Sequence, residues 1–164
     1  MNTYGYVAAN PLRYTDPRGL LCTYNQSTGS MVCVNDETGE EYYRESGYAG
    51  RGEGRNNPNA QGIEFAGPIP RGRWLFDGDW FNSGITGRNT ARLVPLEGNE
   101  CEDTNRQCDT FRIHGNNAEN DASEGCIVLP PNRTLIPPGE VIEVVGGDAL
   151  DPPSDAPNEG VDDD

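Results

Sequence analysis

The sequence predicts a mainly β domain with many turns and few short helices, on two observations. Only 34% of the 164 residues are hydrophobic, and the 21 glycines and 13 prolines are too many for long helices. Short segments rich in β-branched or aromatic residues are bounded by glycine, proline or asparagine, which is typical of strands. The expected strands span 21–24, 31–34, 40–48, 73–80, 91–96, 110–114, 126–129 and 140–145, with one short helical turn over 132–136.

The first two segments predict a hairpin, and the hairpin predicts a disulfide. If the turn over 25–30 pairs Tyr24 with Met31, Cys22 lies directly opposite Cys33. The Cβ atoms of directly opposed strand residues are close to the distance that a disulfide needs. A bridge between these two cysteines is therefore expected.

The remaining three of the five cysteines divide into a pair and a single residue. Cys101 and Cys108 bracket a short polar loop with little apolar content to hold it closed, so we expect a second bridge there. Cys126 is left as a free thiol. Two bridges and one thiol indicate an oxidising compartment such as a periplasm, and the alternative is a cytosolic protein with five reduced cysteines.

The charge pattern excludes several classes of partner. The net charge is −15, and all twelve basic residues are arginines. Such a chain repels phosphates and anionic lipid, so neither nucleic acid nor a membrane surface is expected as a partner. Neither a 20-residue apolar span nor a signal peptide is visible, so we expect that the chain neither crosses a membrane nor exports itself. Residues 148–164 are acidic, rich in proline and without a basic residue, which predicts a disordered tail.

The chain's single histidine, His114, precedes the lone Cys126, which follows Gly125. A thiol needs a base to become a nucleophilic thiolate, and histidine suits that task. The alternative is a satisfied histidine and a small buried cysteine without chemistry. The acidic loop 116–124 lacks the ligand pattern of an EF-hand, and one histidine with paired cysteines is too few for zinc, so neither metal nor cofactor is expected.

A glycine-rich loop over 47–58 fits neither a Walker nor a dinucleotide-binding fingerprint. We expect it to lie along a cleft, where the missing side chains let a peptide substrate approach the backbone.

The N-terminal segment, residues 1–20, differs from the rest. Its run Tyr6-Val7, Asn10-Pro11, Tyr14 and Asp16-Pro-Arg-Gly-Leu20 resembles the closing signature of the core of Rhs-family proteins. The resemblance implies a carrier shell, cleavage after Leu20 and a toxin as cargo. The predicted organisation is therefore an Rhs core end over 1–20, a catalytic domain over 21–147 and the acidic tail over 148–164.

The order of histidine and cysteine, His114-Gly115 followed by Ser123-Glu-Gly-Cys126-Ile127, resembles the motif of the L,D-transpeptidases. Papain-like and amidase-type enzymes have the reverse order, with the cysteine before the histidine in the chain. Further segments resemble a branch of this superfamily used as type VI secretion effectors: 23–29, 47–50, 57–58 and 67–74. The resemblance implies an L,D-transpeptidase-like β-sandwich.

The resemblance also implies roles for individual residues. Cys126 is the expected nucleophile and His114 the expected base. Ser123 is expected to orient the reacting groups, and the backbone N–H groups of Gly125 and Cys126 to stabilise an oxyanion.

The substrate contacts follow less directly from the family. Gly115 or Asn116 is expected to supply the carbonyl that fixes the histidine tautomer. Many housekeeping members carry an arginine shortly after the Cys-Ile pair, where this chain has Val128 and Leu129. Substrate carboxylate binding is therefore expected from Arg88 or Arg92.

The function implied is an antibacterial toxin that cleaves the diaminopimelate–D-alanine bond of peptidoglycan tetrapeptide stems and transfers the acyl group to water or a D-amino acid. The expected partners are these stems, an immunity protein and the Rhs shell, with secretion by the type VI system and action in the target periplasm. The alternatives are a non-catalytic peptidoglycan-binding or carrier-plug module, and a cysteine protease.

Overall fold

The computed structural model describes residues 20–35 and 37–146. The predicted Rhs core end over 1–20, apart from Leu20, and the predicted acidic tail over 148–164 lie outside the described residues. Within the described ranges, no helix is long and apolar enough to span a membrane.

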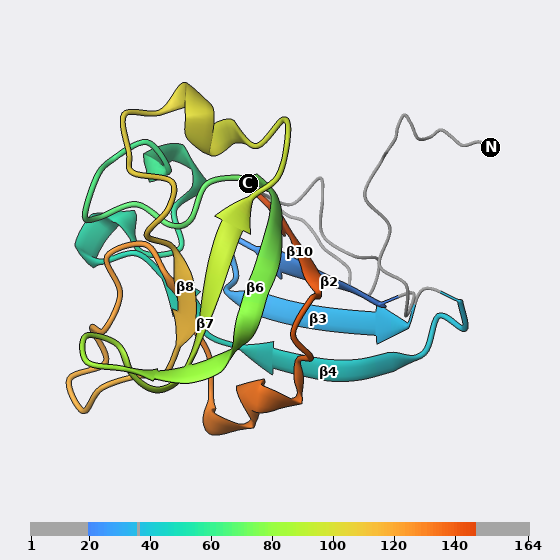
Figure 1. The fold of residues 1–164 in the computed structure, drawn as a ribbon. Coiled ribbons are helices and arrows are strands. Elements are labelled where there is room, and N and C mark those ends of the chain that lie inside the picture. The colour runs from blue at the N-terminus through green and yellow to red at the C-terminus, as the bar shows by residue number, and fades with distance from the viewer. Residues whose placement is uncertain (1–19, 36, 147–164) are drawn as a thin grey trace.

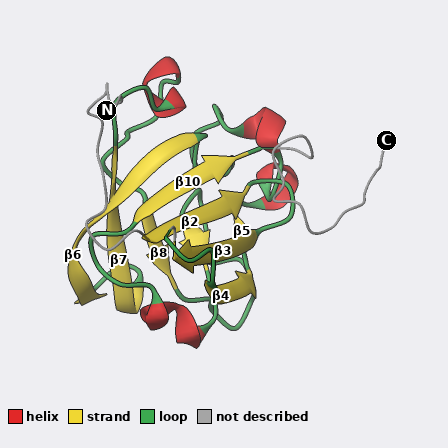
Figure 2. Cartoon of the chain, turned by 90° about the vertical axis from the view of Figure 1, so that its right-hand side faces the viewer, coloured by secondary structure: helices red, strands yellow, loops and turns green. Residues whose placement is uncertain are grey.

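The described chain forms one sheet of nine strands, so the mainly β prediction is confirmed. In sheet order the strands are β4 (Glu41–Ser46), β3 (Ser30–Asn35), β2 (Leu20–Asn25), β10 (Val141–Val145), β6 (Gly72–Ser83), β7 (Gly87–Pro95), β8 (Arg112–His114), β9 (Ile127–Val128) and β5 (Tyr48–Ala49). The short 3-10 helices lie around the strands: η1 (Gly52–Gly54), η2 (Pro58–Ala60), η3 (Glu100–Asp103) and η4 (Pro131–Leu135) (Figure 2). In Figure 1, β6, β7 and β8 stand upright while β2, β3 and β4 cross the view, so the sheet is strongly curled.

The two edge strands of the curled sheet are neighbours in the chain. The edge strands β4 and β5 are consecutive, and Gly47 alone separates them. The N–H of Gly47 donates to the carbonyl of Gly29 at 2.7 Å, and a Cβ on Gly47 would lie 1.7 Å from the carbonyl oxygen of Val128. Only glycine fits there, which explains why the predicted strand over 40–48 divides into β4 and β5.

The first hairpin has the predicted register. Tyr24 pairs with Met31 and Cys22 with Cys33, and the disulfide between these two cysteines is present. The second predicted bridge, between Cys101 and Cys108, is also present. Of the five cysteines, Cys126 is the free one.

The core lies inside the curled sheet. Trp74 and Phe76 on β6 are fully buried, and Trp74 meets the ring of Phe111 edge-on at a centroid distance of 5.2 Å. Burial of aromatic rings and aliphatic side chains from most of the strands supplies the main stabilising contribution. Because β10 lies between β2 and β6, the C-terminal strand joins the first hairpin to the β6–β7 pair that leads to the site.

Candidate active site

The predicted base lies on β8, and the predicted nucleophile immediately precedes β9, the parallel neighbour of β8. In the β8–β9 register, Ile113 pairs with Ile127, so continuing it by one residue sets Cys126 opposite Arg112. Paired residues share one face of a sheet, and His114 lies two positions beyond Arg112, which returns it to that face. Both Cys126 and His114 line a cleft of about 590 Å³. The fold therefore brings the thiol and the imidazole to one cleft.

The tautomer of His114 follows from its hydrogen bond. Nδ1 lies 2.8 Å from the carbonyl oxygen of Gly115. A carbonyl only accepts, so Nδ1 carries the proton and Nε2 is left as the basic nitrogen. Asn116 has a different task, since its Oδ1 accepts from the hydroxyl of Tyr48 at 2.6 Å. That hydroxyl also accepts from the N–H of Ala122 at 2.7 Å, so Tyr48 holds the loop between β8 and β9.

Ser123 is fully buried. Within the described part of the chain, the hydrogen-bond partners of its hydroxyl are backbone atoms. Its Oγ accepts from the N–H of Gly50 at 2.9 Å and of Gly125 at 2.9 Å, and it donates to the carbonyl of Cys126 at 2.6 Å. The hydroxyl therefore shapes the backbone on both sides of the thiol. Since the N–H of Gly125 is engaged by Ser123, the N–H of Cys126 is the remaining candidate of the two predicted oxyanion donors.

Two buried arginines, Arg106 and Arg133, are absent from the sequence prediction and pack against the site, and Arg106 also lines the cleft. The guanidinium of Arg133 donates to the carbonyls of Arg88 at 3.0 Å and Asn89 at 3.0 Å. A Cβ on Gly115 would lie 2.8 Å from its Nη2. In the same way, a Cβ on Gly125 would lie 2.4 Å from Nη2 of Arg106. Each arginine thus packs against a glycine adjacent to one of the two proposed catalytic residues.

The surroundings of His114 favour the neutral ring. Burial lowers the pKa of His114, and the positive charges of Arg133 and Arg112 lower it further. The carbonyl of Gly115 acts in the opposite direction, because it favours a protonated Nδ1. The net shift is downward, so the imidazole is a free base at neutral pH.

The thiol is held mainly in its neutral form as well. Cys126 is partly exposed, yet its protein surroundings remove enough water to raise its pKa. The backbone N–H of Arg112 and the charges of Arg112 and Arg106 lower that pKa, while Glu124 raises it. Both groups that face the cleft are therefore favoured in their neutral forms, which suits proton transfer during attack rather than a preformed ion pair.

The cleft contains arginines other than the two expected from the sequence. Arg88 and Arg92 do not line it, and Arg92 forms an exposed ion pair with Asp77 at 3.0 Å. Arg112 does line it, half-buried beside the catalytic pair. Its guanidinium donates to the hydroxyls of Ser83 at 3.1 Å and Thr86 at 3.4 Å, and no carboxylate bonds to it within the described part of the chain. The sequence held a signal for Arg112, because side chains two positions apart in a strand, such as Arg112 and His114, face the same side of the sheet.

The glycine-rich loop lies beside the cleft, but two of its glycines serve internal packing. A Cβ on Gly50 or Gly54 would lie 2.6 Å or 2.3 Å, respectively, from the carbonyl oxygen of Ala66. These glycines let two backbone segments approach each other. At the cleft itself the loop contributes Arg51, which pairs with Glu124 at 3.5 Å.

A comparison with known protein families finds a match. The model of the Tlde1 domain matches residues 44–136, a span that contains β5 to β9 and both His114 and Cys126. The chain belongs to the Tlde1 domain family. This is a family of type VI secretion effectors of L,D-transpeptidase type, with peptidoglycan-related activity. A search of the curated proteins finds no match. The Tlde1 match does not reach residues 1–20, so the Rhs signature stays a prediction.

Proposed function

We propose that this Tlde1-family chain is a cysteine L,D-transpeptidase and L,D-carboxypeptidase acting on tetrapeptide stems of peptidoglycan. The observation that supports it most is that His114 at the end of β8 and Cys126 immediately before the parallel strand β9 line one cleft, inside the Tlde1 match. The reaction breaks the amide bond between diaminopimelate and the terminal D-alanine.

In the proposed mechanism, Nε2 of His114 takes the thiol proton as Sγ of Cys126 attacks the diaminopimelate carbonyl. The N–H of Cys126 stabilises the oxyanion. The imidazolium then returns the proton to the leaving amine, and D-alanine departs from a thioester. Water or the amine of a D-amino acid attacks the thioester, loses a proton to His114 and regenerates the thiol.

Delivery belongs to the same proposal. The two disulfides support action in an oxidising compartment, the periplasm of a target cell, where peptidoglycan stems are accessible. The signature over 1–20 supports release from an Rhs shell after Leu20. A producer that makes such a toxin needs an immunity protein.

A mass measurement on purified tetrapeptide muropeptides tests the reaction. The protein is incubated with the muropeptide, with and without D-methionine, beside a Cys126→Ala variant. We expect loss of D-alanine, or its replacement by D-methionine, with the unaltered protein alone. An unchanged muropeptide would indicate a binding module, and cleavage of ordinary L-peptides would indicate a cysteine protease.

The pH dependence follows from the directions of the two pKa shifts. Because the pKa of His114 is lowered, we expect kcat/KM to fall at acid pH with a midpoint below the ordinary histidine value of about 6.5. Because the pKa of Cys126 is raised, its alkylation by iodoacetamide, which needs the thiolate, should still increase above about pH 8.5. Stopped assays across pH 4–10 measure both profiles. An acid midpoint above the ordinary value would show that the base is not this buried histidine.

Arg112 is the proposed partner of a substrate carboxylate, since it lines the cleft and its partners are hydroxyls. We expect Arg112→Gln to lower kcat/KM on the tetrapeptide by about 10–100-fold, the worth of a charged hydrogen bond. If Arg112 binds the carboxylate of D-alanine, kcat/KM of the variant and of the unaltered protein should differ far less on a stem ending in D-alaninamide. If Arg112 binds the carboxylate of diaminopimelate, the difference should instead shrink on a stem amidated at that residue. A larger loss from Arg88→Gln or Arg92→Gln would contradict this assignment.

A further inference from the structure

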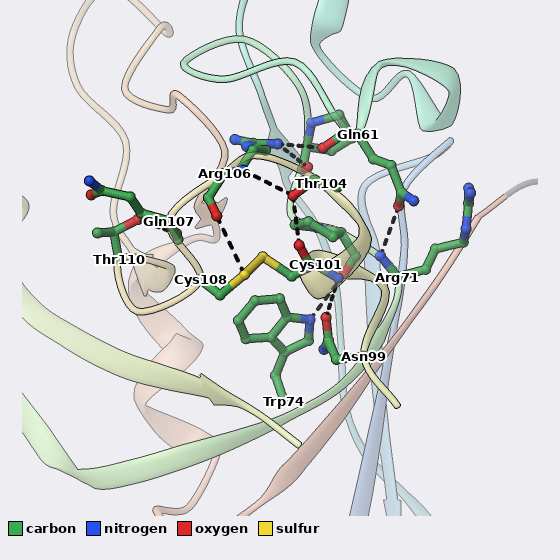
Figure 3. The surroundings of a disulfide bond; sticks show 12 residues. Gln61, Arg71, Trp74, Asn99, Cys101, Thr104, Arg106, Gln107, Cys108 and Thr110 are labelled. Carbon is green, nitrogen blue, oxygen red and sulfur yellow. Dashed lines mark hydrogen bonds between the residues drawn. A yellow bond between two sulfur atoms is a disulfide. The ribbon is translucent and has the colours of Figure 1, made fainter. Parts of the chain in front are cut away.

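A disulfide-closed loop contributes Arg106 and Gln107 to the cleft that the proposed nucleophile lines. The bridge between Cys101 and Cys108 closes it, and the buried Cys101 packs in the core cluster that contains Trp74 (Figure 3). Inside the loop, Thr104 accepts from the N–H of Arg106 at 3.1 Å and donates to the carbonyl of Cys101 at 2.7 Å. The loop therefore has a defined backbone, anchored in the core at one end.

Arg106 reaches out of this loop to two distant segments of the chain. Its Nη1 donates to the carbonyls of Gln61 at 2.8 Å and Pro68 at 2.9 Å, and its Nη2 donates to the carbonyl of Glu124 at 3.0 Å. The guanidinium carbon also lies 4.9 Å from the centre of the Phe111 ring. A charged donor group whose partners are carbonyls fixes those segments without being neutralised.

One of these segments carries the nucleophile. Glu124 precedes Gly125 and Cys126, and Gly125 has a φ of +146° with its Cα against the guanidinium. The stretch following the loop also reaches the thiol, because Sγ of Cys126 donates to the carbonyl of Thr110 at 3.8 Å. Through Arg106 the loop thus contacts the two residues that precede the nucleophile, and Thr110, which follows the loop, contacts its sulfur.

We propose that Arg106 is a positioning residue for Cys126 and that the Cys101–Cys108 bridge holds it there, so that the toxin reaches full activity only after this bridge has formed. The bridge forms when the two thiols lose two electrons and two protons to a disulfide oxidant, as in an oxidising compartment. A dithiol reductant reverses it. The inference rests on the proposed function for its turnover readout, while the reactivity of Cys126 is a readout independent of any substrate.

The chain offers a matched control for the bridge. The Cys22–Cys33 disulfide lies in the β2–β3 hairpin, and neither cysteine lines the cleft. We compare Cys101→Ser/Cys108→Ser with Cys22→Ser/Cys33→Ser, which both leave Cys126 as the free thiol. For the arginine we compare Arg106→Gln and Arg106→Lys with Arg44→Gln, whose side chain is exposed on β4 and pairs with Glu41.

The readouts are kcat and KM on the tetrapeptide, the pH profile of Cys126 alkylation by iodoacetamide, and thermal melting. We expect Arg106→Gln and the Cys101/Cys108 variant to lower kcat by about 10²-fold, the usual effect of a misplacement near 1 Å, with little change in KM. Their alkylation profiles should move to higher pH, because the charge of Arg106 favours the thiolate. Arg106→Lys should recover part of both effects. The Cys22/Cys33 variant and Arg44→Gln should keep kcat.

Several outcomes would overturn the inference. Arg106→Gln with unchanged kcat and alkylation profile would show that the guanidinium does not position the thiol. Equal losses from both bridge variants, in proportion to their melting temperatures, would show that each bridge serves stability alone. If the Cys101/Cys108 variant does not fold, Arg106→Gln alone tests the positioning role, because both disulfides stay intact in that variant. If the unaltered protein releases no D-alanine, the proposed function fails, and the alkylation comparison still tests the positioning role.

Discussion

Replacement of Cys126 by alanine should abolish toxicity when the protein is exported to the periplasm of a susceptible cell. Without the thiol no acyl-enzyme forms, and among the described residues that line the cleft none besides Cys126 is a thiol. His114→Ala should lower kcat by about 10²–10⁴-fold, the usual worth of general acid–base catalysis. Growth after induction, at matched expression, and kcat on the tetrapeptide measure both effects.

Folding controls are needed, because His114 is buried on β8 and Cys126 immediately precedes β9. Cys126→Ala should melt close to the unaltered protein, since the Cys126 side chain is partly exposed. His114→Ala removes a buried ring and should melt lower, so its kcat is measured well below its melting temperature. Full toxicity of either variant at equal expression would exclude the proposed mechanism and favour a binding module.

Gly125→Ala should lower both the stability of the protein and its turnover. The new Cβ would lie 2.4 Å from Nη2 of Arg106 and 2.9 Å from Cε1 of Phe111, and the φ of +146° disfavours any side chain. Overpacking and backbone strain together should lower the free energy of unfolding by about 2–5 kcal/mol. Because the strain falls on the residue before the nucleophile, kcat should fall as well, and melting and turnover are the two measurements.

Substitutions at two other glycines separate the effect of backbone strain from that of overpacking. Gly39→Ala introduces a positive-φ alanine, at +74°, with no atom within 4 Å, so it measures backbone strain alone. Gly84→Ala meets open space without a positive φ and should be near neutral. If Gly125→Ala lost no more stability than Gly39→Ala and kept its kcat, the close packing of Arg106 would not matter for the site.

The sequence predicted those parts of the fold whose contacts are local. The β2–β3 register follows from a short turn, so the pairing of Cys22 with Cys33 was readable from it. The parallel pairs β2–β10 and β8–β9 join segments far apart in the chain, and no local pattern specifies their register. The closing of the sheet at Gly47 depends on the same long-range pairings and was missed.

In the site, too, the features set by local sequence were predictable and those set by long-range pairing were not. His114 and Cys126 were visible as motif residues, but their shared face required the β8–β9 register. Arg106 and Arg133 were missed because arginine is ordinarily exposed, and nothing in their sequence surroundings marks them as buried. The predicted role of Arg88 or Arg92 had no motif behind it, and the arginines that line the cleft are Arg51, Arg106 and Arg112.

The central claim is that Cys126 carries the acyl group, and mass mapping of the acylated residue tests it most directly. The protein is mixed with tetrapeptide muropeptide, quenched in acid within the first turnovers, digested and mapped by mass spectrometry. We expect a thioester adduct on the peptide containing Cys126, with the mass of the stem minus D-alanine, that disappears on addition of D-methionine. Product formation with Cys126 unmodified throughout, or with the adduct on another residue, would contradict the account.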